Sequence, residues 1–277
     1  MAVQKEKVRL TAEEETLLIT LYAKAYGCPR AFFDDQTARQ VIEQIDYDFA
    51  SLKVPTGTRL TVCLRAKKLD EYLIQFLAQN PRGTVLNLGC GLDSRCVRVE
   101  AGEAQWYDLD LPGVIKIREK FFEQTDNYHM IPASVTDFEW MNAITYSDKG
   151  VFVVAEGLLM YLGEAGVKSL VLKLQEEFPG CELACDAFSR MTARNIKEHP
   201  SLKKTGAVVA WGIDDPKEIE TWGEGIRFKE EWFFTQAEEI KLLSPGNRLM
   251  FQISGMFSVA KKAHRILHYQ LGTRHKE

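Results

Sequence analysis

The sequence predicts an α/β protein in which a doubly wound sheet follows a helical amino-terminal segment. Three observations support this fold class. Residues 11–80 carry apolar side chains at helical spacing. From residue 84 to residue 189, short apolar stretches alternate with longer amphipathic ones, which is the pattern of strands alternating with helices. The stretch at 150–157 is almost continuously apolar, as is typical of a parallel strand covered on both faces.

Three helices are expected before the sheet. The first opens at Thr11, which forms a capping-box pattern with the glutamate three residues later, and closes at Gly27. The second covers residues 34–46, where apolar residues recur at helical spacing. The third covers residues 58–80 and ends before Pro81, which cannot continue a helix.

The rest of the chain is expected to supply the sheet. Strands are predicted at 84–89, 104–112, 128–134, 150–157 and 181–189, with helices at 113–124 and 164–180. Residues 248–261 are interpreted as a closing pair of strands, and residues 262–271 as a terminal helix or an extended segment. The simplest account is one domain over residues 1–277, with a helical cap at 1–82 and an α/β core at 83–277 that carries a late insertion around 205–232.

The late segment is also rich in tryptophan. Trp211, Trp222 and Trp232 lie among turn signals. Large aromatic side chains mostly pack inside a protein or between its layers, so a place in the late part of the core is expected. The alternative is that they cover a flat aromatic substrate.

Composition and charge restrict the classes of function. The 277 residues are 45% hydrophobic and 27% charged, and the formal net charge of −4 predicts no nucleic-acid surface. Basic runs such as 65–68 are expected on solvated helix faces. The first residues lack the apolar region of a secretory signal, and no stretch approaches the roughly 18 apolar residues of a membrane helix. A cytoplasmic protein without membrane contact is therefore expected.

Cysteine and histidine spacing predicts no metal site. The six cysteines include no Cys-x-x-Cys pair. Cys181 and Cys185 fall in one expected strand, where they point the same way but lie about 13 Å apart. His264 and His268 stand four residues apart without an evident third ligand. Reduced, mostly buried thiols and packing or surface histidines are expected.

A glycine-rich turn after the first strand indicates a nucleotide site. Gly89 and Gly91 let the backbone approach a ligand closely where a strand leads into a helix. Ser94 is small enough for a dinucleotide fingerprint, but Asp93 would repel a pyrophosphate. A phosphate-free cofactor with a sulfonium and an ammonium, S-adenosylmethionine, therefore fits better than NAD.

Two acidic residues follow strands at the same edge of the predicted sheet. Asp110 ends the second strand about twenty residues beyond the glycines, where an acid can accept hydrogen bonds from both ribose hydroxyls. The alternative is a capping role before Pro112. Glu156 directly follows the apolar fourth strand, where burial without a partner would be costly. It is therefore expected to reach the cleft or to meet a cation.

These motifs resemble the leucine carboxyl methyltransferase family, in particular its bacterial branch of O-methyltransferases in polyketide biosynthesis. The matching stretches are "VLNLGCGLDSR" at 85–95, "WYDLDLPGVI" at 106–115 and "AEGLLMYL" at 155–162. The likeness runs from about Thr16 to "EEWFF" at 230–234, which is most of the chain. It implies a class I S-adenosylmethionine-dependent methyltransferase, with a seven-stranded sheet whose last strand is antiparallel.

The resemblance also implies roles for individual residues. Arg65, with Asp70 five residues on, matches the arginine that holds the methionyl carboxylate, and Lys24 matches a basic residue that assists it. The remaining matches are the glycine loop, the ribose-binding acid and the acid beside the methionyl end, at Gly89, Gly91, Asp110 and Glu156.

The adenine contacts depart from the family pattern. The family places Asp-Leu after the third strand, where this chain has Ser134 and Val135. Val135 is expected to pack on the ring, and Ser134 to accept a hydrogen bond from the exocyclic amine. Asp137 either takes over that role or caps the following helical turn.

The chemistry implied is an in-line displacement at a methyl group, which alignment of the two reactants accelerates. A carboxylate acceptor needs no general base at neutral pH, whereas a phenol with a pKa of about 10 would benefit from one. No convincing base is found, although His129 is a candidate at the cleft edge. Tyr161 is expected either to orient the acceptor or to pack at the rim.

The sequence therefore predicts an O-methyltransferase that acts on a carboxylate or hydroxyl of a polyketide-like small molecule. One alternative is methylation of a protein carboxyl terminus. A second is an NAD(P)-dependent oxidoreductase, for which no Tyr-x-x-x-Lys motif is found. A third is a catalytically silent binding protein on the same scaffold. The acceptor and the oligomeric state are left open.

Overall fold

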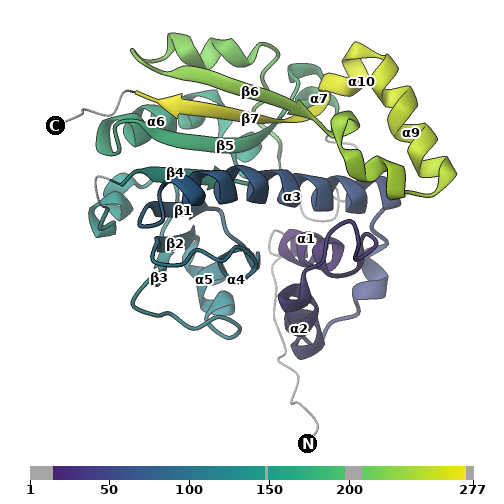
Figure 1. Cartoon of the computed structure of the whole chain (residues 1–277), viewed down its shortest axis with the longest axis horizontal. Coiled ribbons are helices and arrows are strands. Elements are labelled where there is room, and N and C mark those ends of the chain that lie inside the picture. The colour runs from purple at the N-terminus through teal and green to yellow at the C-terminus, as the bar shows by residue number, and fades with distance from the viewer. Residues whose placement is uncertain (1–14, 147–148, 197–207, 273–277) are drawn as a thin grey trace, which may run out of the picture.

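The computed structural model describes residues 15–146, 149–196 and 208–272. Its centre is a seven-stranded sheet with the strand order β3-β2-β1-β4-β5-β7-β6 (Figure 1). Neighbouring strands from β3 to β5 pair in parallel, whereas β7 is antiparallel to both β5 and β6. The strands are β1 (Thr84–Leu88), β2 (Gln105–Asp110), β3 (Tyr128–Pro132), β4 (Val151–Ala155), β5 (Cys181–Phe188), β6 (Arg227–Phe233) and β7 (His264–Leu271). The predicted α/β class, with an antiparallel last strand, is confirmed.

Helices cover both faces of this sheet and its carboxyl edge. The α-helices are α1 (Glu15–Tyr26), α2 (Gln36–Gln44), α3 (Thr56–Gln79), α4 (Arg95–Arg98), α5 (Pro112–Arg118), α6 (Gly163–Glu177), α7 (Arg190–Asn195), α9 (Pro245–Met256) and α10 (Ser258–Lys262). Short 3-10 helices are η1 (Phe49–Leu52), η2 (Phe138–Ala143), η3 (Leu159–Tyr161), η5 (Pro216–Thr221), η6 (Phe234–Gln236) and η7 (Glu238–Leu242).

The central strand β4 shows how the sequence builds two layers. All of its residues are buried, and successive side chains point to opposite faces. Phe152 and Val154 pack with α3, while Val151 and Val153 join a second cluster with α6. Burial on both faces accounts for the continuous apolar run, so the prediction of a covered parallel strand is confirmed.

The amino-terminal helices lie beside the carboxyl edge of the sheet. Helix α2 has a well-formed start, because the Asp35 side chain accepts a hydrogen bond from the Ala38 amide. Its buried face packs with α1 and with residues of α5. The expected start of the first helix at Thr11 lies outside the described residues.

The prediction of paired strands at 248–261 is wrong, because this stretch forms α9 and α10. Pro245 occupies the first turn of α9, where its fixed φ and missing amide hydrogen suit a helix. Phe251 is buried against α3, while Leu249 and Ile253 remain exposed. The last two strands are instead β6 and β7, and β7 settles the open alternative for residues 264–271 in favour of an extended segment.

The described tryptophans of the late segment pack into the molecule. Trp211 is buried in the core around β4 and β5, while Trp222 and Trp232 are half-buried and pack against core clusters. Within residues 15–146, 149–196 and 208–272, no helix is long and apolar enough to cross a membrane. The division of the chain into a helical cap and a core with an insertion stays a prediction.

Candidate functional site

A pocket opens at the carboxyl ends of β1 and β4, between these strands and helices α1 and α3. In parallel α/β sheets, ligands bind at this edge. Its charged lining alternates in sign and consists of Lys24, Arg65, Asp93 and Glu156. Its apolar lining includes Val62, Met160 and Phe188.

The glycine turn forms one wall of the pocket. Gly89 and Gly91 have φ values of 64° and 52°, in the left-handed region that favours glycine. A Cβ atom on Gly91 would lie 2.9 Å from Leu17 Cδ2 of α1, and one on Gly89 would lie 3.0 Å from Leu158 Cδ1. Both glycines are therefore required for backbone shape and for packing against Leu17 and Leu158, while a close approach of this turn to a ligand stays a prediction.

Asp110 lies at the end of β2 and ties two turns together. One carboxylate oxygen accepts a hydrogen bond of 2.7 Å from the Gly91 amide, and the other accepts one of 2.8 Å from the Leu111 amide. Burial raises the pKa of Asp110, although these amide hydrogen bonds oppose the shift. Each oxygen keeps a further acceptor position, so the carboxylate can brace the glycine turn and still accept from a ligand hydroxyl.

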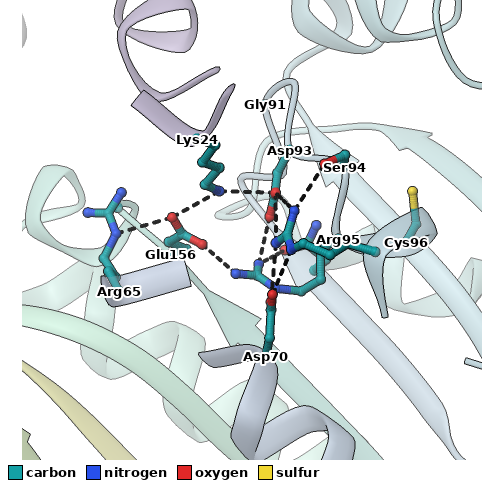
Figure 2. A network of polar contacts seen from close by, with 12 residues as sticks. Lys24, Arg65, Asp70, Gly91, Asp93, Ser94, Arg95, Cys96 and Glu156 are labelled. Atoms are coloured by element: carbon teal, nitrogen blue, oxygen red, sulfur yellow. Dashed lines mark hydrogen bonds and ion pairs between the residues drawn. The ribbon is translucent and has the colours of Figure 1, made fainter. Parts of the chain in front are cut away.

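Glu156 lies at the centre of the charged lining (Figure 2). Its carboxylate contacts Lys24 Nζ at 3.0 Å, Arg65 Nε at 3.2 Å, and Arg95 Nη2. Burial alone would raise the pKa of Glu156, but the charges of Lys24, Arg95 and Arg65 outweigh it and lower the pKa to about 2. The prediction that Glu156 would reach the cleft or meet a cation is confirmed on both counts.

Arg65 is buried, which contradicts the expectation that the basic run 65–68 forms a solvated face. It donates from Nη1 to Asp186 at 2.9 Å in addition to its contact with Glu156. The reason is tertiary: Arg65 lies on the side of α3 that faces the ends of β4 and β5. The carboxylates of Glu156 and Asp186 lie there, and their negative charges compensate for the desolvation of the guanidinium.

A set of buried charged side chains extends beneath the pocket. The sequence patterns did not predict it. Asp93 contacts Lys24 Nζ at 3.0 Å and Arg95 Nη1 at 2.8 Å. Arg95 and Arg98 both donate to Asp70 at 2.6 Å from their Nε atoms. The helical motif from Arg65 to Asp70 thus has two functions: the arginine faces the pocket, whereas the aspartate anchors the helix that follows the glycine turn.

The sequence indicates of Asp93 only that it disfavours a pyrophosphate. In the structure it lines the pocket, and its pKa lies well below the usual range, because the charges of Arg95, Lys24 and Arg98 outweigh burial.

The sequence also contains a signal for Asp186. Asp186 is a carboxylate within an apolar strand, and Glu156 directly follows one, so at both positions burial of the charge is costly unless a partner compensates for it.

The residues expected at the adenine lie beyond this pocket. Val135 is buried in the core, and the Ser134 hydroxyl contacts the Thr136 hydroxyl at 2.9 Å. The Asp137 carboxylate accepts from the Glu139 amide, which agrees with the capping alternative. The segment is adjacent to Asp110, because the Ala133 amide donates to the Asp110 carbonyl at 3.0 Å. A role of Ser134 and Val135 toward adenine stays a prediction.

Tyr161 lines the pocket and is 40% exposed, and its role toward an acceptor stays a prediction. His129 is elsewhere: it lies at the amino end of β3, stacks on Tyr107 and contacts Gln105 at 3.2 Å. The expectation that His129 reaches the cleft edge is therefore wrong, since strand direction places it at the opposite edge.

The two histidines spaced by four residues lie on β7 rather than on a helix. His264 contacts Asp186 at 2.7 Å, and His268 contacts Glu182 at 2.8 Å. Each histidine thus pairs with a carboxylate of β5. Among residues 15–146, 149–196 and 208–272, no group of three or more His, Cys, Asp or Glu side chains is arranged to hold a metal ion.

The side chains of the pocket fit a ligand with an amino acid end. Arg65 and Lys24 suit a carboxylate, whereas Glu156 and Asp93 suit an ammonium. The glycine turn forms one wall of the pocket, and Asp110, which braces this turn from beside the pocket, suits a pair of hydroxyls. A pyrophosphate fits poorly, because the carboxylates of Asp93 and Asp110 flank the turn.

Comparisons with known proteins agree with this geometry. The chain is 37% identical over 269 residues to the tetracenomycin polyketide synthesis O-methyltransferase TcmP of Streptomyces glaucescens, covering 95% of this chain and 98% of that protein. It is 32% identical over 255 residues to the S-adenosyl-L-methionine-dependent methyltransferase dpfgK of Gibberella zeae, covering 83% and 85%. An S-adenosylmethionine-dependent methyltransferase structure from Mesorhizobium loti superposes with a TM-score of 0.55 at 12% identity, covering 76% of this chain and 99% of that one.

The fold and the relatives together define the class: the protein is an enzyme, an S-adenosylmethionine-dependent methyltransferase built on the class I sheet. The family model for leucine carboxyl methyltransferase matches residues 18–175. The chain belongs to the leucine carboxyl methyltransferase family. The predicted family, enzyme class and methyl donor are thereby confirmed.

Proposed function

We propose that this enzyme transfers the methyl group of S-adenosylmethionine to an oxygen atom of a small, largely apolar acceptor of the polyketide type. The observation that carries the proposal is the lining of the pocket, where paired cations and carboxylates adjoin the glycine turn and open toward an apolar rim. The O-methyltransferase TcmP, which aligns with nearly the whole chain, supports this acceptor class.

The residues of the pocket are assigned roles by their chemistry. Arg65 and Lys24 bind the carboxylate of the methionyl group, and Glu156 binds its ammonium. The backbone of Gly89 and Gly91 passes close to the ligand. Asp110 accepts from the ribose hydroxyls, and Ser134 and Val135 lie toward the adenine. When bound, S-adenosylmethionine supplies an electrophilic methyl group on a sulfonium.

The protein's main contribution to the reaction is alignment. Holding the two reactants in line removes translational and rotational freedom before the reaction, which is worth several kcal/mol. Burial raises the pKa of Tyr161, so its phenol stays protonated at neutral pH. Tyr161 can therefore donate a hydrogen bond that orients the acceptor oxygen, but it cannot remove a proton. A carboxylate acceptor needs no such removal, because it is ionised at neutral pH.

Exposed apolar side chains of α9 near the pocket favour an apolar acceptor over an acidic peptide. Helix α9 exposes Leu249, Met250 and Ile253 on one face. A Cβ atom on Gly57 would lie 3.8 Å from Met250 Cε, and the next residue, Thr58, lines the pocket. Contiguous exposed apolar surface commonly marks a ligand-binding or interaction region. Methylation of a protein carboxyl terminus is the second candidate, supported by the family description alone.

The first test is ligand binding. Calorimetric titration of the wild type is expected to show binding of S-adenosylmethionine and none of NADH. The Asp110→Ala variant is expected to bind the methyl donor at least tenfold more weakly, which is about 1.4 kcal/mol. Unchanged affinity in a folded Asp110→Ala variant would remove this residue from the site, and preferential binding of NADH would reject the methyltransferase.

The second test concerns the acceptor. Radiolabelled methyl transfer to a panel of polycyclic phenols, aromatic carboxylic acids and peptides with a carboxyl-terminal leucine is expected to label the small aromatic compounds. The Met250→Asp variant should raise the KM for those acceptors without changing the affinity for S-adenosylmethionine. The matched control is Ile74→Asp, an exposed residue about 24 Å further along the same helix as Thr58. Labelling of the peptide alone would favour the second candidate.

A further inference from the structure

Asp186 is the only charged residue of the pocket network described above that lies on β5. It is fully buried, and donors from three other elements converge on its carboxylate. Arg65 Nη1 of α3 lies 2.9 Å away, and His264 Nε2 of β7 lies 2.7 Å away. The Gly157 amide, in the turn after β4, donates to the other oxygen at 2.6 Å. Asp186 therefore joins β5 to the helix, the strand and the turn that border the pocket.

These contacts define the direction of the Arg65 guanidinium. Nε faces Glu156 and Nη1 faces Asp186, so two of its three nitrogens are assigned to carboxylates. The third, Nη2, lies beside Gly157, where an added Cβ atom would approach it to 3.2 Å. Gly157 has a φ of 66°, which glycine adopts without strain, and both Arg65 and Gly157 line the pocket.

His264 supports Asp186 from β7. Its ring packs between Phe188 and Phe234, with centroid separations of 4.5 Å and 4.9 Å. Burial lowers the pKa of His264, although its contact with Asp186 opposes the shift. The imidazole is therefore neutral at neutral pH, and the tautomer with hydrogen on Nε2 donates to the carboxylate.

We infer that Asp186, held in place by His264, is a positioning residue that orients Arg65 and the Gly157 turn toward the methionyl carboxylate of the methyl donor. This inference rests on the proposed function. Its consequence is selective. Loss of Asp186 should lower the affinity for ligands that carry the amino acid end and leave the affinity for ligands with only the adenosyl part nearly unchanged.

The same two strands contain a matched control pair. Glu182 and His268 stand four residues from Asp186 and His264 on β5 and β7, and their contact is 2.8 Å long. This second pair contacts Lys229 and Tyr72 instead of pocket residues. Glu182 is 21% exposed, whereas Asp186 is fully buried, so the control reports the effect of removing a carboxylate charge from the same ladder at a less buried position.

The experiment compares two ligands by calorimetry. S-adenosylhomocysteine carries the methionyl carboxylate, and 5′-methylthioadenosine lacks it. Asp186→Asn is expected to lower the affinity for S-adenosylhomocysteine at least tenfold and the affinity for 5′-methylthioadenosine less than threefold. Glu182→Gln is expected to change both by less than threefold. Adding Arg65→Ala to Asp186→Asn should cause less than a further threefold loss, because both changes act through one guanidinium.

The outcomes separate the inference from the proposed function. A wild type that binds neither ligand overturns the proposed function and the inference with it. A wild type that binds both, together with an Asp186→Asn variant that loses both equally, overturns the inference alone. If Asp186→Asn does not fold, the same two ligands are titrated into His264→Phe. Phenylalanine keeps an aromatic ring at position 264 and removes the Nε2 hydrogen bond to Asp186. For His264→Phe, a three- to tenfold loss of affinity for S-adenosylhomocysteine with less than a threefold loss for 5′-methylthioadenosine supports the inference, and an equal loss for both ligands, or no loss, rejects it.

Discussion

Two buried ionic clusters lie on either side of the glycine turn, and they differ in what they leave available. In the first, the carboxylate of Asp108 is enclosed by donors of the protein: Asn87, Trp106, Tyr128 and Arg118. Asp108 and Arg118 are both fully buried. In the second, Lys24, Arg65, Asp93 and Glu156 pair with one another and also line a pocket.

The difference shows that burial of charge does not by itself mark a binding site. The Asp108 cluster is a structural support for the turn, because Arg118 Nη1 also donates to the Gly91 carbonyl at 3.0 Å. The Glu156 cluster has the same chemistry, but its members line a pocket, where the proposed function has them exchange partners with a zwitterionic ligand. Access therefore distinguishes the two, and the following variants test that distinction.

The largest effect is expected from Arg118→Ala. Removal of one partner leaves the Asp108 charge buried and uncompensated, which costs about 3–5 kcal/mol in the free energy of unfolding. Urea denaturation followed by circular dichroism measures this loss. The control is Arg82→Ala, whose pair with Glu103 is exposed and should contribute less than about 1 kcal/mol. Equal losses in the two variants would contradict a structural role for the Asp108 cluster.

The second effect concerns acid stability at the pocket. The pKa of Glu156 in the folded protein, about 2, lies below its ordinary value of 4.5. Its contribution to stability is therefore complete above pH 4.5 and is lost as the pH falls from 4.5 toward 2. The contribution is on the order of 3 kcal/mol, since each tenfold change in proton affinity equals about 1.4 kcal/mol.

Unfolding of the wild type and of Glu156→Gln between neutral pH and pH 2 measures this term. The variant is expected to show a weaker decline of stability over the acid range, whereas Glu43→Gln, at an exposed site on α2, should follow the wild type. Parallel curves for Glu156→Gln and the wild type would show that the cationic neighbours do not lower the pKa of Glu156 in the folded protein.

The smallest effect is expected at Tyr161, which is partly exposed at the mouth of the pocket. Tyr161→Phe removes one neutral hydrogen bond to the acceptor, so kcat/KM for the acceptor should fall by about three- to tenfold, equivalent to about 1 kcal/mol. The affinity for S-adenosylmethionine should not change. Steady-state kinetics with a labelled acceptor measures the first quantity and calorimetry the second. A fall in cofactor affinity instead would move Tyr161 from the acceptor side to the donor side of the pocket.

Local sequence patterns were sufficient for the strands of the parallel part of the sheet and for the turn that follows β1. Burial on both faces requires continuous apolar residues in β4, and a left-handed turn requires glycine at positions 89 and 91. Strand order and the family motifs then placed Asp110 and Glu156 at one edge. These features depend on residues that are neighbours in the chain, so a pattern can indicate them.

Only the tertiary structure decided which charged residues pair with one another and which secondary structure the last part of the chain adopts. Arg65 contacts Asp186, which is 121 positions away in the sequence, and Asp186 contacts His264, a further 78 positions away. No spacing rule can relate such residues, because their distance is defined by packing of α3, β5 and β7. The helices at 245–262 had the same origin: closely spaced apolar residues such as Met250, Phe251 and Ile253 fit a strand as well as a helix, and the packing of Phe251 against α3 decided between them. Residue chemistry therefore defined which groups the site contains, while long-range packing defined which of them meet.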